Sequence, residues 1–156
     1  DITAVFGEME SSNPELAQLV GSAENLQGAA LWAFNMDSRT AGFTDNVNVR
    51  SFDLGGETVD DLGPMLDPLA EQYAQMGFDV QERVDDLQVG GRPAARITYD
   101  YTVNTADLGA VKALGRQYIV VGNSNVWILS YTVGDAAGDE GMAIIDQSAQ
   151  TFQVTD

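Results

Sequence analysis

The 156-residue sequence contains neither histidine nor cysteine, and Lys112 is its only lysine. Without histidine and cysteine the chain lacks imidazole bases, thiolate nucleophiles and the soft ligands of most zinc sites. Disulfides are excluded too, but a lack of cysteine does not distinguish a secreted protein from a cytosolic one. Because most recognisable active sites need these residues, we expect a protein that is not an enzyme and uses no cofactor.

Basic residues are scarce: seven Lys and Arg stand against 24 Asp and Glu, which gives a formal charge of −17. Nucleic-acid binding needs a basic face, so we expect no nucleic-acid partner. Carboxylate-rich surfaces keep proteins hydrated and monomeric. We therefore interpret the acidity as serving solubility or life in salt, and we expect a monomer or weak dimer. A cationic partner or Ca²⁺ is the alternative.

Long apolar runs are also missing, so no segment of the sequence predicts a membrane-spanning helix or direct insertion into a membrane. The chain starts at Asp1 with no signal-peptide pattern, which predicts a mature or trimmed form whose anchor, if there is one, lies upstream. No linker or repeat divides the sequence, and its length suits one core. We expect a single domain over residues 1–156.

Helix and strand patterns alternate along the first half of the chain. A helix is predicted from Asn13, where Pro14 follows as a tolerated first-turn residue. Alternating apolar residues predict strands at 30–36 and 47–54, with a turn at 45–48 between them. Apolar residues three and four apart predict a helix up to Gly77, which starts either at a capping box on Thr58 or near Pro64.

The second half of the sequence favours strands. Residues 78–103 predict a hairpin that turns at Gly90-Gly91, followed by antiparallel strands at 116–121 and 126–133. Acidic residues at Asp139 and Glu140 precede a helical stripe that ends at Phe152. This order predicts an α+β fold with a central antiparallel sheet of about six strands flanked by helices, an α/β/α sandwich.

No sequence motif identifies a catalytic site. Neither a dinucleotide-binding fingerprint nor a phosphate-binding loop occurs, and Lys112 is expected to be a solvated lysine rather than a nucleophile. Two carboxylates across a cleft could hydrolyse glycosides, but 24 acids make such pairs uninformative. We therefore predict no catalytic, cofactor-binding or metal-binding residues, and a carboxylate-based hydrolase stays a remote alternative.

A few residues have alternative interpretations. Asp135, Asp139 and Glu140 lie in a glycine-rich stretch that could bind Ca²⁺, although helix capping by Asp139 explains them more simply. Trp32 and Trp127 could line a recognition surface, but their alternating neighbours favour the core. Asn46 and Asn48 could contact a partner, but a turn is favoured.

The order of elements and several motifs resemble the Mog1/PsbP-like superfamily, and the actinobacterial LpqN/LpqT-type lipoproteins look most similar. The resemblance covers roughly residues 28–154. Its most specific parts are Asp45-Asn46-Val47-Asn48-Val49 and Gly90-Gly91-Arg92-Pro93-Ala94. Members of this superfamily commonly begin with a further strand around a Pro-x-x-Trp segment, and residues 2–9 contain no Trp.

The resemblance implies binding rather than catalysis, and it supplies no site residues. It leads us to expect an extracytoplasmic accessory domain of the bacterial cell envelope, tethered by an upstream lipoprotein signal, that binds a protein partner. The alternative is a cytoplasmic chaperone or adaptor that shields the apolar helices of a client. Such a chaperone needs an exposed apolar patch of several hundred Å².

Overall fold

The computed structural model describes residues 11, 29–35, 37–38, 44–105 and 109–154. The helix predicted from Asn13 lies outside these residues. Within them the chain forms β1 (Leu31–Asn35), β2 (Asp45–Asp53), α4 (Gly63–Gln75), β3 (Asp79–Val89), β4 (Arg92–Thr105), β5 (Gly109–Val121), β6 (Asn125–Gly134), a short 3₁₀ turn η2 (Asp135–Ala137) and α5 (Gly138–Gln150). The order of helices and strands in this region agrees with the sequence prediction.

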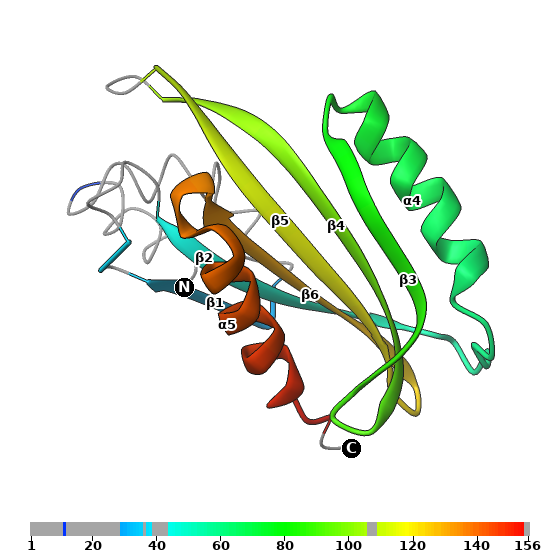
Figure 1. The fold of residues 1–156 in the computed structure, drawn as a ribbon. Helices are drawn as coiled ribbons and strands as arrows, with labels where there is room; N and C mark the ends of the chain where they lie inside the picture. Colours follow the sequence, from blue (N-terminus) through cyan, green and yellow to red (C-terminus); the bar gives the residue numbers. More distant parts are fainter. Residues whose placement is uncertain (1–10, 12–28, 36, 39–43, 106–108, 155–156) are drawn as a thin grey trace.

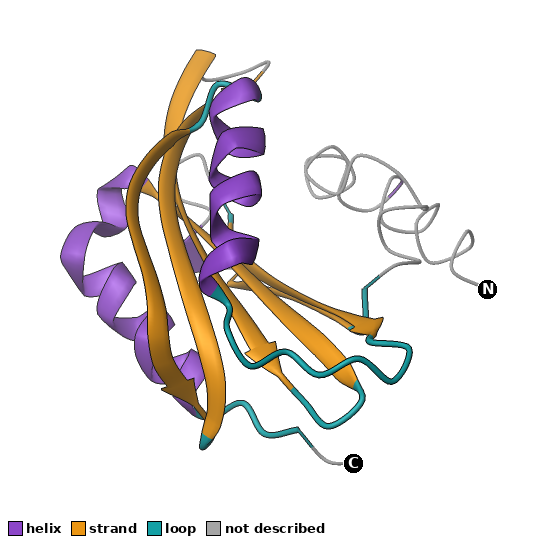
Figure 2. Ribbon diagram, turned by 90° about the vertical axis from the view of Figure 1, so that its right-hand side faces the viewer, coloured by secondary structure: helices purple, strands orange, loops and turns teal. Residues whose placement is uncertain are grey.

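All six strands form one antiparallel sheet in the order β1-β2-β6-β5-β4-β3. Figure 2 shows the two helices on opposite sides of this sheet. The predicted α+β fold, with an antiparallel sheet flanked by helices, is therefore confirmed.

Each face of the sheet builds its own apolar core. Neighbouring strand residues point to opposite faces, so Ala94 packs toward α5 while Ala95 packs toward α4. The α5 core contains Ile145 and Ala149 of that helix, and Leu62 and Leu66 anchor the α4 side. Alternation along β4, β5 and β6 thus supplies apolar side chains to both faces.

Several predicted boundaries were wrong. The stretch 45–48 is not a turn but the start of β2, because Asn46 and Asn48 pair with Phe34 and Trp32 of β1. Strand β5 starts at Gly109 rather than Arg116, because its first residues also pair with β4. Several of these residues are small, so the alternation of apolar and polar side chains is too weak there to predict a strand. Helix α4 starts at Gly63, which confirms the alternative start near Pro64 and not the capping box on Thr58.

Two glycine turns were predicted correctly. Gly90 and Gly91 both have positive φ, 56° and 78°, and connect β3 to β4. Gly77, with φ 83°, follows the last turn of α4. At Gly77 the chain turns out of the helix and enters β3 two residues later, and this turn positions the site described next.

Candidate functional site

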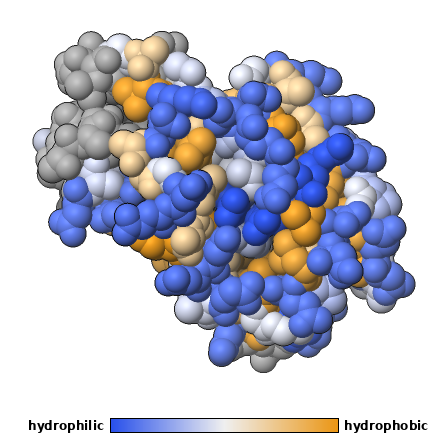
Figure 3. Space-filling view, viewed as in Figure 1, coloured by the Kyte–Doolittle hydropathy of each residue, from blue (hydrophilic) through white to orange (hydrophobic). Residues whose placement is uncertain are grey.

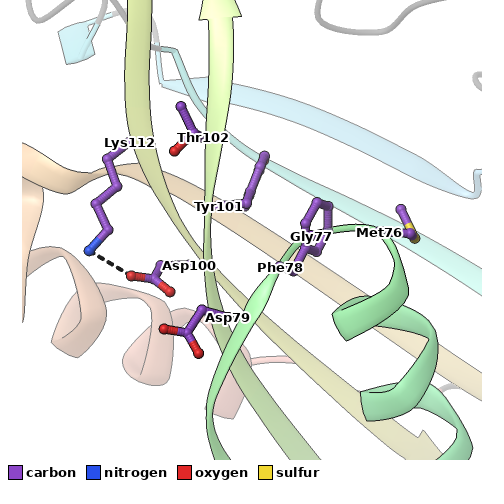
Figure 4. Close-up of a pocket in the computed structure, with 8 residues that line it drawn as sticks. All are labelled: Met76, Gly77, Phe78, Asp79, Asp100, Tyr101, Thr102 and Lys112. Atoms are coloured by element: carbon purple, nitrogen blue, oxygen red, sulfur yellow. Dashed lines mark ion pairs between the residues drawn. The ribbon is translucent and has the colours of Figure 1, made fainter.

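A pocket of about 270 Å³ opens where α4 runs into β3. Its lining comes from three segments: the end of α4 with the start of β3, the middle of β4, and β5 (Figure 4). The lining residues are Met76, Gly77, Phe78, Asp79, Asp100, Tyr101, Thr102 and Lys112.

The pocket exists because β4 is longer than its neighbour β3. The last pair between the two strands joins Asp79 to Asp100, whereas β4 continues to Thr105 and stays paired with β5 on its inner side. Figure 1 shows β4 and β5 extending together past the start of β3. Within the described residues, the outer edge of β4 from Tyr101 to Thr105 has no strand partner.

Aromatic rings form one wall of the pocket. The Phe78 and Tyr101 rings stack with centroids 4.6 Å apart, and the Phe78 and Tyr99 rings lie 5.3 Å apart. Tyr73 of α4 packs on Tyr99 at 4.5 Å. The rings belong to α4, to the connection that leads into β3 and to β4, so packing between these segments holds the apolar wall.

The Tyr73 hydroxyl continues this contact as a hydrogen-bonded chain across the sheet. It donates to Gln117 Oε1 at 2.8 Å, and Gln117 Nε2 donates to Ser130 Oγ at 2.7 Å. Burial raises the pKa of the Tyr73 hydroxyl, which therefore stays protonated and acts as a donor. The chain fixes the orientation of the helix above the pocket.

Charged groups form the opposite wall. Lys112 Nζ lies 2.6 Å from Asp100 Oδ2, and Gln81 Nε2 donates to Asp100 Oδ1 at 3.0 Å, so both oxygens of the buried Asp100 are used. The hydrogen bond from Lys112 holds the pKa of Asp100 below its ordinary value although burial opposes this. Asp79 is exposed beside them and makes no ion pair with any described residue.

The electrostatic balance at this wall is negative. The pKa of Lys112 is raised by its hydrogen bond with Asp100 and by the charges of Asp100, Asp135 and Asp79. The charges of three carboxylates therefore act on one ammonium group. The raised pKa keeps Lys112 protonated, which makes it a poor nucleophile or base.

A second polar cluster joins α5 to the sheet. Arg116 Nη1 lies 2.5 Å from Asp146 Oδ1, and the Tyr118 hydroxyl donates to the same oxygen. Arg96 binds Glu82 at 2.8 Å and lies 3.7 Å from Asp146. Burial first, and then the hydrogen bond to Asp146, raises the pKa of Tyr118 to about 12. These groups are engaged with one another, so the cluster ties a helix to the sheet.

The structure separates the residues that the sequence singled out. Lys112 lies in the pocket, and the expectation of a solvated lysine was incomplete because its partly exposed ammonium pairs with a buried carboxylate. Trp127 packs against the α5 core and contacts Phe152 at 5.7 Å. Trp32 is half-buried on β1 beside Phe34 at 5.8 Å. Both tryptophans are partly buried, and neither lines the pocket.

Asn46 and Asn48 lie in β2, away from the pocket, and Asn46 Nδ2 donates to the Thr44 carbonyl. The expected cap at Asp139 was wrong: the N-cap of α5 is Ala137, and Asp139 lies with Glu140 in the first turn, where acids suit the helix dipole. Asp135 lies in η2. Across the described residues no group of three or more acids is arranged to hold a metal ion.

Sequence reasoning missed Asp79, Asp100 and Tyr101 as site residues. The signal for Asp100 was weak, because its place on the polar side of an alternating strand is typical of solvent exposure, yet only 12% of its side chain is exposed. Burial here depends on pairing with β5 and on Lys112. Asp79 and Tyr101 become neighbours of this pair only through the register between β3 and β4.

The pocket combines an aromatic wall, an exposed carboxylate and a free strand edge. These features suit the binding of a ligand or a chain segment. Outside the pocket, hydrophilic residues cover most of the face in Figure 3, with apolar residues in patches between them. No described helix is long and apolar enough to cross a membrane.

No family model matches this chain, and no curated protein matches it in sequence. Among solved structures, the fold is similar to the crystal structure of a Pseudomonas aeruginosa protein of unknown function that has been suggested as a regulator. The match has a TM-score of 0.51 and 19% sequence identity, and it covers 72% of this chain and 74% of the other. At this identity the likeness supports the fold and carries no function.

Proposed function

We propose that this chain is a non-enzymatic binding domain that holds a protein partner at the pocket beside β4. The observation that carries the proposal is the coincidence of a 270 Å³ pocket with the free outer edge of β4 beyond Asp100. A free strand edge presents backbone donors and acceptors to a partner, and the neighbouring pocket can take up one of its side chains.

The cell envelope is the location we propose, with a tether upstream of the sequence. The support is the resemblance in sequence to LpqN/LpqT-type lipoproteins. The cytoplasmic chaperone has less support on the described surface. Large exposed apolar side chains are spread over β1, β2, both ends of α4 and α5, and do not form one patch: Leu31, Phe52, Met65, Met76 and Ile144.

Site-specific photo-crosslinking of the full-length protein in its native cells tests this proposal. A photoreactive residue replaces Thr102, which is exposed at the pocket, and in a matched variant it replaces Gln147, which is exposed on α5. We expect a discrete crosslinked protein from position 102 in the envelope fraction and none from position 147. Equal crosslinking from both positions, or none from position 102, would contradict the binding site, and a partner recovered only from cytosol would contradict the envelope location.

A further inference from the structure

The free edge of β4 differs from the outer edges of β3 and β1, the two outermost strands of the sheet. The outer edge of β3 carries many charged residues and two register irregularities, features that hinder pairing with another chain. At the opposite side, β1 is only five residues long. By contrast, Tyr101–Thr105 reads Tyr-Thr-Val-Asn-Thr, a segment with no charge and three β-branched residues. This segment therefore lacks the charges and register irregularities that protect β3 against an added strand.

The length and position of this edge suit one short strand. Five residues span about 17 Å, close to the length of a typical strand in a sheet. An incoming strand that pairs with Tyr101–Thr105 would run in line with β3 and meet its first residue, Asp79. The pocket lies at this junction, where Figure 4 shows the side chains of Asp79 and Asp100 on the same side of β4 as Lys112.

Charge indicates the chemistry of the occupant. Both oxygens of Asp100 are engaged, whereas the exposed carboxylate of Asp79 is available for an incoming cation. The net negative balance around Lys112 favours a cationic side chain over an anionic one. A second copy of the chain is disfavoured, because two molecules of charge −17 repel each other.

We propose that the outer edge of β4 at Tyr101–Thr105 binds an extended, basic segment of the partner protein as a seventh strand, with a Lys or Arg side chain of that segment paired to Asp79. The next residue of that segment points to the other face of the sheet, where the aromatic wall of Phe78 and Tyr101 contacts an apolar side chain. This inference rests on the proposed function and adds the class of partner and the mode of binding.

Peptide titrations of the whole protein followed by NMR test the inference. The probe is the capped peptide Val-Lys-Val-Lys-Val-Lys-Thr, compared with the same peptide carrying Glu in place of Lys. We expect the basic peptide alone to shift the amide resonances of Tyr101–Thr105. Two further peptides carry N-methyl groups on every second backbone amide, one on the odd-numbered residues and the other on the even-numbered residues. Because a strand added at one edge uses every second amide in its hydrogen bonds, one of these peptides should lose binding and the other should retain it.

Two protein variants separate the pocket from general attraction to an acidic surface. Asp79→Asn should weaken binding of the basic peptide about two- to fivefold, the range typical of one exposed ion pair. Asp60→Asn removes the same charge from an exposed position just before α4 begins, at the opposite end of that helix from the pocket. This control variant should leave the affinity for the basic peptide unchanged.

The inference would be overturned if both variants weakened binding equally, or if the shifts spread over the acidic surface. It would also be overturned if both methylated peptides failed to bind, or if both of them bound. A dimer formed through β4 in the free protein would also overturn it. If crosslinking from position 102 succeeds while the basic peptide does not bind, the proposed function stands and only the partner class is wrong. If both fail, the binding site itself is wrong.

Discussion

At the scale of single residues, Asp146 shows how one carboxylate can secure a helix to a sheet. Its oxygen accepts hydrogen bonds from Tyr118 and from Arg116, and the Arg116 side chain is only 12% exposed. Burial alone would raise the pKa of Asp146, but these donors outweigh burial and the pKa lies below its ordinary value. The native state therefore binds a proton less readily at Asp146 than the unfolded chain does.

This pKa shift predicts a pH-dependent stability. Above the unfolded pKa of about 3.9 the charged Asp146 stabilises the fold, and that contribution is lost as the pH falls through the lower folded pKa. We expect Asp146→Asn to lower the free energy of unfolding by about 1 kcal/mol at pH 7, with the difference from wild type shrinking toward pH 3. Denaturant titrations across this range measure it. Glu71→Gln, an exposed change on α4, is the control; a pH-independent difference for Asp146→Asn would contradict the account.

The two hairpin glycines provide a second prediction at this scale. Both have positive φ, so an alanine at either position costs about 1–2 kcal/mol of backbone strain. A Cβ at Gly91 meets open space, whereas a Cβ at Gly90 would overlap the carbonyl oxygen of Phe152. We expect Gly90→Ala to lower the melting temperature more than Gly91→Ala, by a margin visible in calorimetry. Equal losses would show that the tail after α5 does not pack on this turn.

At the scale of elements, the two helices cover opposite faces of the sheet through separate apolar clusters. The sequence predicted α4 and α5, the hairpin turns and the antiparallel pairs, because apolar periodicity and glycine turns are local signals. It misplaced Asn46 and Asn48, since polar side chains suit a turn and only the partners of β2 place them in a strand. The pocket was not predictable either, because it depends on β4 continuing past its neighbour β3.

Helix α4 holds the aromatic wall of the pocket and is itself anchored by Leu66, which is 3% exposed. Leu66→Ala should lower the free energy of unfolding by about 2–5 kcal/mol, because it removes buried methyl groups and leaves a cavity. Met65→Ala at the neighbouring exposed position should cost far less. Chemical denaturation of both variants measures the contrast, and similar losses would show that α4 does not pack on the sheet through this side.

At the scale of the whole molecule, a formal charge of −17 sets the behaviour in salt. Carboxylates far outnumber the cations available to pair with them, so the folded state experiences net self-repulsion that dissolved ions screen. We expect the melting temperature to rise between 20 mM and 500 mM sodium chloride. A fall over this range would show that the ion pairs, such as Arg116 with Asp146, outweigh the repulsion.

In the proposed function, the same charge favours cationic partners, and we propose that the free edge of β4 is where they bind. Hydrogen exchange of the backbone amides, measured on the free protein and on the complex isolated with the partner crosslinked at position 102, tests this most directly. The account predicts slower exchange within Tyr101–Thr105, the part of β4 that has no outer neighbour in the described structure. Unchanged exchange there, with protection on another surface instead, would contradict it.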